Sequence, residues 1–123
     1  MVSESRIKSD VETLSASPRN SIQNKQQHAT AAEWIANQFT KIGLSINRTV
    51  FDIPMQSPER SGLNIIGTLN PDSTERPVLI GAHYDTVAGS PGADDNASGV
   101  AAMLECARIL VEAESSRKIV FAA

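Results

Sequence analysis

The amino-acid sequence predicts an α/β fold with a mixed sheet that contains a parallel βαβ unit. One observation is that apolar residues recur at helical spacing in two separate segments of the chain. Another is that short runs rich in β-branched and aromatic residues lie outside those segments. The third is the order strand, long loop, helix, strand in the second half of the chain, which is the order of a βαβ unit.

The first predicted helix runs from Gln26 to Ile42, and Gly43 is a natural C-terminal stop for it. His28 lies one turn before Ala32 on the apolar stripe of this helix, so it is either a metal ligand or a half-buried residue near the helix start. A lone histidine has no ligand spacing, which favours the second interpretation.

Two strands are predicted in the middle of the chain. Ile46 to Ile53 is rich in β-branched and aromatic residues and is ended by Pro54. Leu63 to Leu69 alternates apolar and polar residues, as a half-covered strand does. The connection from Met55 to Ser61 contains proline and charged residues and is predicted to be a surface loop.

The βαβ unit is predicted to follow a turn at Asn70 to Pro77. Val78 to Ala82 is apolar without alternation, which is typical of a strand covered on both faces. About fifteen residues of mostly Gly, Ser, Pro, Asp and Asn come next, and long ordered loops of this kind are often functional. Ile119 to Ala123 begins a second apolar strand, so the two strands should be parallel neighbours joined by a right-handed crossover.

The helix between these strands has one apolar and one polar face. Glu105, Arg108 and Glu112 mark the polar face and are expected to meet solvent. Cys106 on the flank is expected to be a small buried residue rather than a reactive thiol. The apolar face consists of Val100, Met103, Leu104, Ala107, Leu110 and Val111.

Composition indicates one soluble globular domain, because the chain has 123 residues, of which 41% are hydrophobic. The net charge is −3 and the basic residues are scattered, so nucleic acid is excluded as a partner. Met1 to Asp10 is polar, with no apolar run of signal-peptide or membrane-spanning length, so a chain with an authentic start is expected to be cytoplasmic and without a membrane partner. A single cysteine excludes a thiolate zinc cluster, so any metal must be held by histidine and carboxylates.

Polar residues that can bind a metal gather where ligands bind in open parallel sheets, beyond the carboxyl ends of the strands. His83 and Asp85 lie on the same side of an extended segment, because side chains alternate along a strand. Asp85 can therefore orient the His83 ring through its second nitrogen. Asp94 and Asp95 lie just before the helix, where they act either as helix caps or as metal ligands, and the nearby His-x-Asp favours the metal.

The combination of imidazole and carboxylate suits zinc. A carboxylate can place one oxygen on each of two cations, and two zinc ions that share an aspartate and a water form a hydrolytic centre.

The segments Val78 to Val87 and Pro91 to Val100 resemble the metal-binding core of the co-catalytic zinc aminopeptidases, metallopeptidase family twenty-eight. The specific part is His-Tyr-Asp at 83–85 combined with Gly-Ala-Asp-Asp-Asn-Ala-Ser-Gly at 92–99. Looser support comes from Arg19, from the helix that ends at Gly43 and from the strand that begins at Leu63. The resemblance implies the first half of a zinc-exopeptidase α/β sandwich, with two zinc ions in the complete enzyme and a peptide as substrate.

The resemblance also implies residue roles. His83 binds one zinc and Asp95 bridges both, while Asp85 orients the histidine and Asp94 is a neighbour rather than a ligand. It further implies a cis bond between Asp95 and Asn96, and a glycine at position 99 that allows a close approach to the helix.

The family pattern continues with a Gly-Gly-Glu-Glu segment, which supplies the general base and a ligand, and later with an aspartate and a histidine. None of these has a counterpart in residues 1–123, which are therefore expected to form a single incomplete peptidase domain. Glu105 and Glu112 are not expected to replace the missing ligands, because they lie on the predicted solvent face. Weak zinc binding or none, and no activity, are expected for the chain alone.

Three interpretations of function remain. The chain is a truncated zinc-dependent aminopeptidase, a non-catalytic scaffold or binding module, or a relative of glutaminyl cyclases or carboxypeptidases. An unpaired sheet edge in a fragment would favour self-association.

Overall fold

The computed structural model describes residues 1–53 and 60–123, and its elements are three α-helices, four strands and one short helical turn. The helices are α1 (Glu4–Leu14), α2 (Lys25–Ile42) and α3 (Ser98–Glu112), and the turn η1 (Ala93–Ala97) directly precedes α3. The strands are β1 (Ser45–Ile53), β2 (Arg60–Leu69), β3 (Val78–Gly81) and β4 (Ile119–Ala122).

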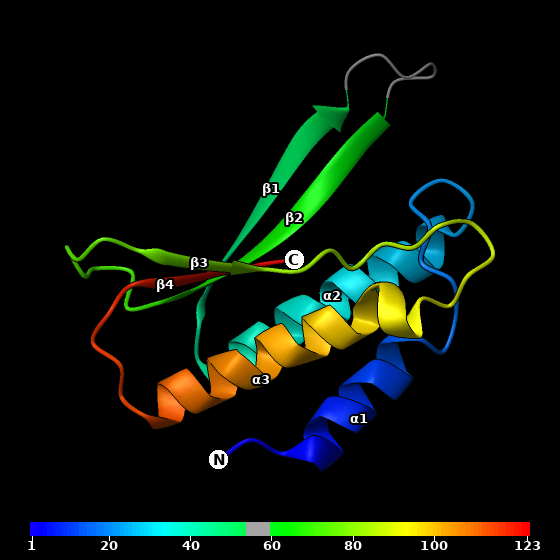
Figure 1. Cartoon of the computed structure of the whole chain (residues 1–123). Coiled ribbons are helices and arrows are strands. Elements are labelled where there is room, and N and C mark those ends of the chain that lie inside the picture. The colour runs from blue at the N-terminus through cyan, green and yellow to red at the C-terminus, as the bar shows by residue number, and fades with distance from the viewer. Residues whose placement is uncertain (54–59) are drawn as a thin grey trace.

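The four strands form one mixed sheet in the order β1-β2-β4-β3. β3 pairs with β4 in parallel, and the other two pairs are antiparallel. Figure 1 shows the helices on one face of this sheet, with α1 packed beside α3. The predicted α/β class with a parallel βαβ unit is confirmed.

The core lies between the sheet and the helices α2 and α3. Phe39 of α2 and Phe121 of β4 lie with ring centroids 6.4 Å apart at its centre. The fully buried apolar side chains around them come from α2, β2 and α3, and they include Ile35, Ile65, Val100 and Leu104. These side chains hold α2 and α3 against the sheet.

The prediction for α2 and β1 is confirmed to within one residue at each start. Gly43 adopts φ 95°, and its N–H and that of Leu44 close the last turn of α2 onto the Phe39 carbonyl. Residues 54–59 of the predicted surface loop lie outside the described residues. The end of that loop, at Ser61, is instead part of β2, which begins at Arg60.

The prediction that Val78 to Ala82 is covered on both faces is wrong. β3 is an edge strand, and Leu79 on it is 70% exposed. Within residues 1–53 and 60–123, the helices cover one face of the sheet, so an apolar run was not evidence for two covered faces.

The expectation that Glu105 and Arg108 of α3 meet solvent is also wrong, because α1 covers them, whereas Glu112 is exposed as expected. The Glu105 side chain is buried and is held by Arg6, with Nη2 2.7 Å from Oε1, and by the Ser3 N–H at 2.7 Å. Arg108 reaches Asp10 of α1 at 2.7 Å. The hydrogen bonds from Arg6, with smaller contributions from Ser3 and Arg108, outweigh burial and lower the pKa of Glu105 to about 2.

Cys106 is exposed, contrary to the expectation of a buried residue, because it lies on α3 away from both α1 and the sheet. In the part of the chain that the structure describes, no helix is long and apolar enough to cross a membrane.

Candidate metal centre

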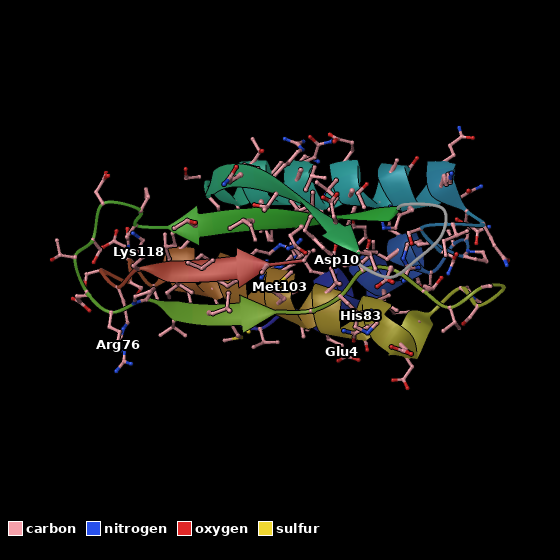
Figure 2. All side chains as sticks on the ribbon, turned by 90° about the horizontal axis from the view of Figure 1, so that it is seen from above. Glu4, Asp10, Arg76, His83, Met103 and Lys118 are labelled. Atoms are coloured by element: carbon pink, nitrogen blue, oxygen red, sulfur yellow. The ribbon has the colours of Figure 1, made fainter. Side chains whose placement is uncertain are left out.

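The segment after β3 places its side chains alternately inward and outward. Tyr84 points inward and is only 4% exposed, and its hydroxyl donates to the Leu63 carbonyl at 3.1 Å. Burial, with a smaller contribution from Asp85, raises the pKa of Tyr84 to about 12. His83 and Asp85, on either side of it, are both about half exposed, as the alternation predicts. Figure 2 shows His83 just beyond the end of β3.

His28 stacks on the inward-pointing tyrosine, with ring centroids 4.8 Å apart. Burial lowers the pKa of His28, and the negative charge of Asp85 opposes this shift in part. The expectation of a half-buried histidine near the start of α2 is confirmed.

Each nitrogen of the His83 ring faces one carboxylate. Nδ1 lies 3.2 Å from Asp85 Oδ1, and Nε2 lies 3.0 Å from Asp95 Oδ1. The structure thus brings together all three residues of the sequence-predicted site, although Asp95 comes from a different segment of the chain. Asp85 is placed to accept the Nδ1 proton, which leaves the Nε2 lone pair for a ligand.

The two atoms that face each other fit a shared zinc ion as two of its ligands. With ligand bonds of about 2.0 to 2.1 Å, two ligands of a tetrahedral zinc lie roughly 3.3 Å apart, close to the 3.0 Å between His83 Nε2 and Asp95 Oδ1. No group of three or more histidine, cysteine or acidic side chains arranged for a metal occurs in residues 1–53 and 60–123. The described residues thus bring together two side chains of the kinds that bind zinc.

Asp95 is held outside the helix that follows it. The peptide bond between Asp95 and Asn96 is cis, as the resemblance implied. Both residues have non-helical backbone angles within η1, and the Asp95 side chain is 76% exposed. Its carboxylate is therefore directed toward solvent and His83 rather than into a helical turn.

The cap of α3 comes from Asn96. Its Oδ1 accepts the Gly99 N–H at 3.1 Å, and a Cβ at Gly99 would lie 2.3 Å from that oxygen. Gly99 thus permits a close approach, and the group that approaches is the Asn96 amide. Because Asn96 caps the first turn, the carboxylate of Asp95 remains available for a metal. The backbone carbonyl of Asp94 accepts a hydrogen bond from the Ser98 hydroxyl at 2.8 Å.

Gly92 joins the two segments that carry the site. Its φ is +59°, and a Cβ there would lie 2.5 Å from both the Asp95 carbonyl oxygen and Thr86 Cγ2. This contact between Gly92 and Thr86 and the buried position of Thr86 were not predicted from the sequence. A glycine after a proline in the long loop was the available signal.

Residues 64–123 match the family described as Peptidase family M28. The chain resembles this family over that segment, which contains both motifs of the candidate site. The resemblance to this family that the two motifs indicated is thereby confirmed.

Among relatives of the family, Aminopeptidase YwaD of Bacillus subtilis (strain 168) is 48% identical over 62 residues, which are 49% of this chain and 14% of that protein. A Porphyromonas gingivalis glutaminyl cyclase superposes with a TM-score of 0.87 at 26% identity, covering 98% of this chain and 44% of that one. A Zn-dependent exopeptidase from Parabacteroides distasonis superposes with a TM-score of 0.84 at 23% identity, covering 98% and 46%. The chain thus has the zinc-exopeptidase fold over nearly its whole length and spans less than half the length of each of these proteins.

Proposed function

We propose that residues 1–123 form the N-terminal part of a zinc-dependent aminopeptidase domain, in which His83 and Asp95 bind metal and Asp85 orients His83. The observation that carries the proposal is the 3.0 Å separation of His83 Nε2 and Asp95 Oδ1, with Asp85 on the other ring nitrogen. The match of residues 64–123 to Peptidase family M28 and an aminopeptidase among the relatives support the reaction class.

Zinc, when bound, supplies Lewis acidity to the carbonyl of the peptide bond and makes a water a better nucleophile near neutral pH. The chain's own residues hold the geometry for this chemistry. Asp85 keeps a proton on Nδ1 of His83, so that Nε2 is the ligand atom. Asp95 presents one oxygen to His83 and keeps its second oxygen for a further cation.

The chain alone is proposed to bind zinc weakly and to lack peptidase activity. A catalytic zinc takes three protein ligands, whereas the described residues bring two together. In the domain as a whole, the peptide substrate would lie beyond the ends of β3 and β4, next to His83.

Zinc titration of the 123-residue chain, followed by NMR, tests the metal site. The His83 ring signals and the Asp95 amide are expected to shift, and both shifts are expected to disappear in His83→Ala. Cys106→Ser is the matched control, because it removes the exposed thiol and leaves the site intact. Shifts confined to other residues, or unchanged in His83→Ala, would disprove the metal role.

Hydrolysis of leucine p-nitroanilide by the same chain tests the second part. No chelator-sensitive turnover is expected. Turnover that a chelator abolishes would show that two ligands suffice and would overturn the proposal that the chain lacks activity.

Glutaminyl cyclisation is the second candidate reaction, because the superposition on the Porphyromonas gingivalis enzyme is close. Leucine aminopeptidases and glutaminyl cyclases both occur among the solved structures with this fold, so the substrate decides between the two reactions. The test uses a protein that contains residues 1–123. If this protein cyclises an N-terminal glutamine and does not hydrolyse leucine p-nitroanilide, the result would favour glutaminyl cyclisation over the aminopeptidase reaction.

A further inference from the structure

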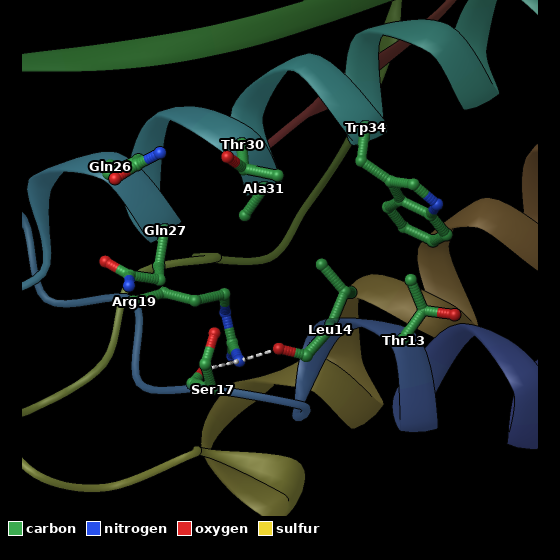
Figure 3. Close-up of a pocket in the computed structure, with 9 residues that line it drawn as sticks. All are labelled: Thr13, Leu14, Ser17, Arg19, Gln26, Gln27, Thr30, Ala31 and Trp34. Carbon is green, nitrogen blue, oxygen red and sulfur yellow. Dashed lines mark hydrogen bonds between the residues drawn. The ribbon is translucent and has the colours of Figure 1, made fainter.

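Arg19 is a buried arginine whose side chain binds backbone carbonyl oxygens. It is 2% exposed and lies in the connection between α1 and α2, beside a cavity of about 280 Å³ that Figure 3 shows. A charged group is stable in such a place only when its donors are satisfied. The hydrogen bonds of the guanidinium therefore indicate what Arg19 holds in place.

The guanidinium joins three separate segments. Nε donates to the Tyr84 carbonyl at 2.8 Å, and Nη1 donates to the Pro91 carbonyl at 2.7 Å. Nη2 donates to the Gly92 carbonyl at 3.2 Å, and Nη1 also donates to the Leu14 carbonyl at the end of α1.

The main chain around Arg19 strengthens the same connection. Its backbone N–H donates to Thr86 Oγ1 at 2.9 Å, and the Asn20 side chain donates to the Thr86 carbonyl at 2.8 Å. Residues 19 and 20 therefore hold the segment after β3 at two successive points.

Two of these segments carry the candidate metal ligands. Tyr84 lies between His83 and Asp85, so a bond to its carbonyl fixes the backbone from which both side chains project. Gly92 packs against the Asp95 carbonyl, so a bond to Gly92 fixes the backbone on the other side of the site.

We infer that Arg19 is a positioning residue that sets the separation of His83 and Asp95 and thereby the zinc affinity of the pair. The inference rests on the proposed metal role of these two residues. Arginine suits the task because its planar fork of five donors can reach several segments at once. A lysine ammonium is a single point with three donors and cannot span the same carbonyls.

The surroundings keep Arg19 charged. Burial lowers the pKa of the guanidinium, and the negative charge of Asp85 opposes this. An arginine has a pKa high enough to remain protonated after such a shift, so its donors stay available.

The test compares Arg19→Lys with Arg108→Lys in the 123-residue chain. Arg108 is the matched control, because it is also a largely buried guanidinium, but its partners are Asp10, Glu105 and Gln38. Urea unfolding gives the stability of each variant, and calorimetric zinc titration gives its affinity. Both variants are expected to lose stability, whereas only Arg19→Lys is expected to weaken zinc binding, by about tenfold or more.

A second readout needs no metal. The nuclear Overhauser effect between the His83 ring and the Asp95 side chain is expected in the unsubstituted chain and in Arg108→Lys, and it is expected to be lost in Arg19→Lys. Thr86→Val is a milder variant for the case that Arg19→Lys does not fold, since it removes only the hydroxyl that accepts the Arg19 N–H. It is expected to weaken the same signal.

The outcomes separate the two proposals. An unchanged Overhauser effect and unchanged zinc affinity in Arg19→Lys or Thr86→Val would overturn the positioning role. The Overhauser effect could be strong in the unsubstituted chain and lost in Arg19→Lys, while the unsubstituted chain shows no zinc binding that depends on His83. This result would support the positioning of the side chains, but it would overturn the metal role and the claim on zinc affinity.

Discussion

The arginine clusters near the two ends of α1 differ in what they bind. Near its start, Arg6 and Arg108 bind the carboxylates of Glu105 and Asp10. Beyond its end, Arg19 binds backbone carbonyl oxygens of three segments. The first cluster pairs charges and joins α1 to α3, so it contributes to stability. The second positions the backbone of the site, so a change there is expected to alter geometry beyond its effect on stability.

The largest effect on stability is expected for Gly92→Ala, which changes one of the segments that Arg19 binds. The new methyl group would lie 2.5 Å from the Asp95 carbonyl oxygen and from Thr86 Cγ2, at a positive φ. We expect a loss of about 3 kcal/mol or more in the free energy of unfolding, measured in urea. The variant is also expected to lose the zinc-dependent shifts of His83.

Gly89→Ala is the control for this variant. Gly89 also has a positive φ, of 76°, but its Cβ position has no neighbour within 4 Å. It should show only the backbone strain of about 1 kcal/mol and retain the site. Equal effects of the two substitutions would show that the contact between the two segments is unimportant.

A smaller loss is expected for Glu105→Gln in the other cluster. Removing the charge weakens the hydrogen bonds from Arg6 and Arg108 in a buried place. We expect the unfolding free energy to fall by about 2 to 3 kcal/mol. Zinc-dependent shifts of His83 are expected to persist in the folded fraction, and their disappearance would contradict the division between the two clusters.

The pH dependence of stability sharpens the same comparison. The folded-state pKa of Glu105 is about 2, below its ordinary value of 4.5, so the unfolded state takes up its proton first as the pH falls. The stabilisation is therefore complete above about pH 5 and is lost between about pH 4.5 and 2, with a total of about 3 kcal/mol. In Glu105→Gln the urea midpoint should fall less over this range. An identical pH profile would show that another carboxylate is responsible.

The smallest effect on stability is expected at the exposed edge strand. Leu79→Lys replaces a side chain that is 70% exposed, so the unfolding free energy should change by less than about 0.5 kcal/mol. We propose that the edge of β3 mediates self-association, and light scattering should then show less of it in this variant. Equal scattering by both chains would argue against association through this edge.

Parts of the fold and the site that depend on local patterns could be predicted from the sequence. Alternation along an extended segment placed His83 and Asp85 on one side, and helical spacing located α2 and α3. The prediction for the polar face of α3 failed because charged residues on a helix are expected to be exposed unless the element that covers them is known. That partner, α1, buries little apolar surface beyond Val11 and Leu14, and so gave a weak signal.

The role of Arg19 could not be predicted for a different reason. Its partners are backbone carbonyls at Tyr84 and Gly92, which lie 65 and 73 residues away along the chain. Every residue type has such a carbonyl, so no side-chain pattern marks the contact. The metal role of Asp95 stays a prediction, which the zinc titration tests.

The inward position of Tyr84 restricts how the chain length can change here. The tyrosine is fixed between Leu63 and His28, so it sets which of its neighbours face outward. Insertion of one residue between Tyr84 and Asp85 would turn the carboxylate toward the core and place the inserted side chain next to His83. A change of length by a single residue would therefore remove the site even if every side chain of the segment were kept.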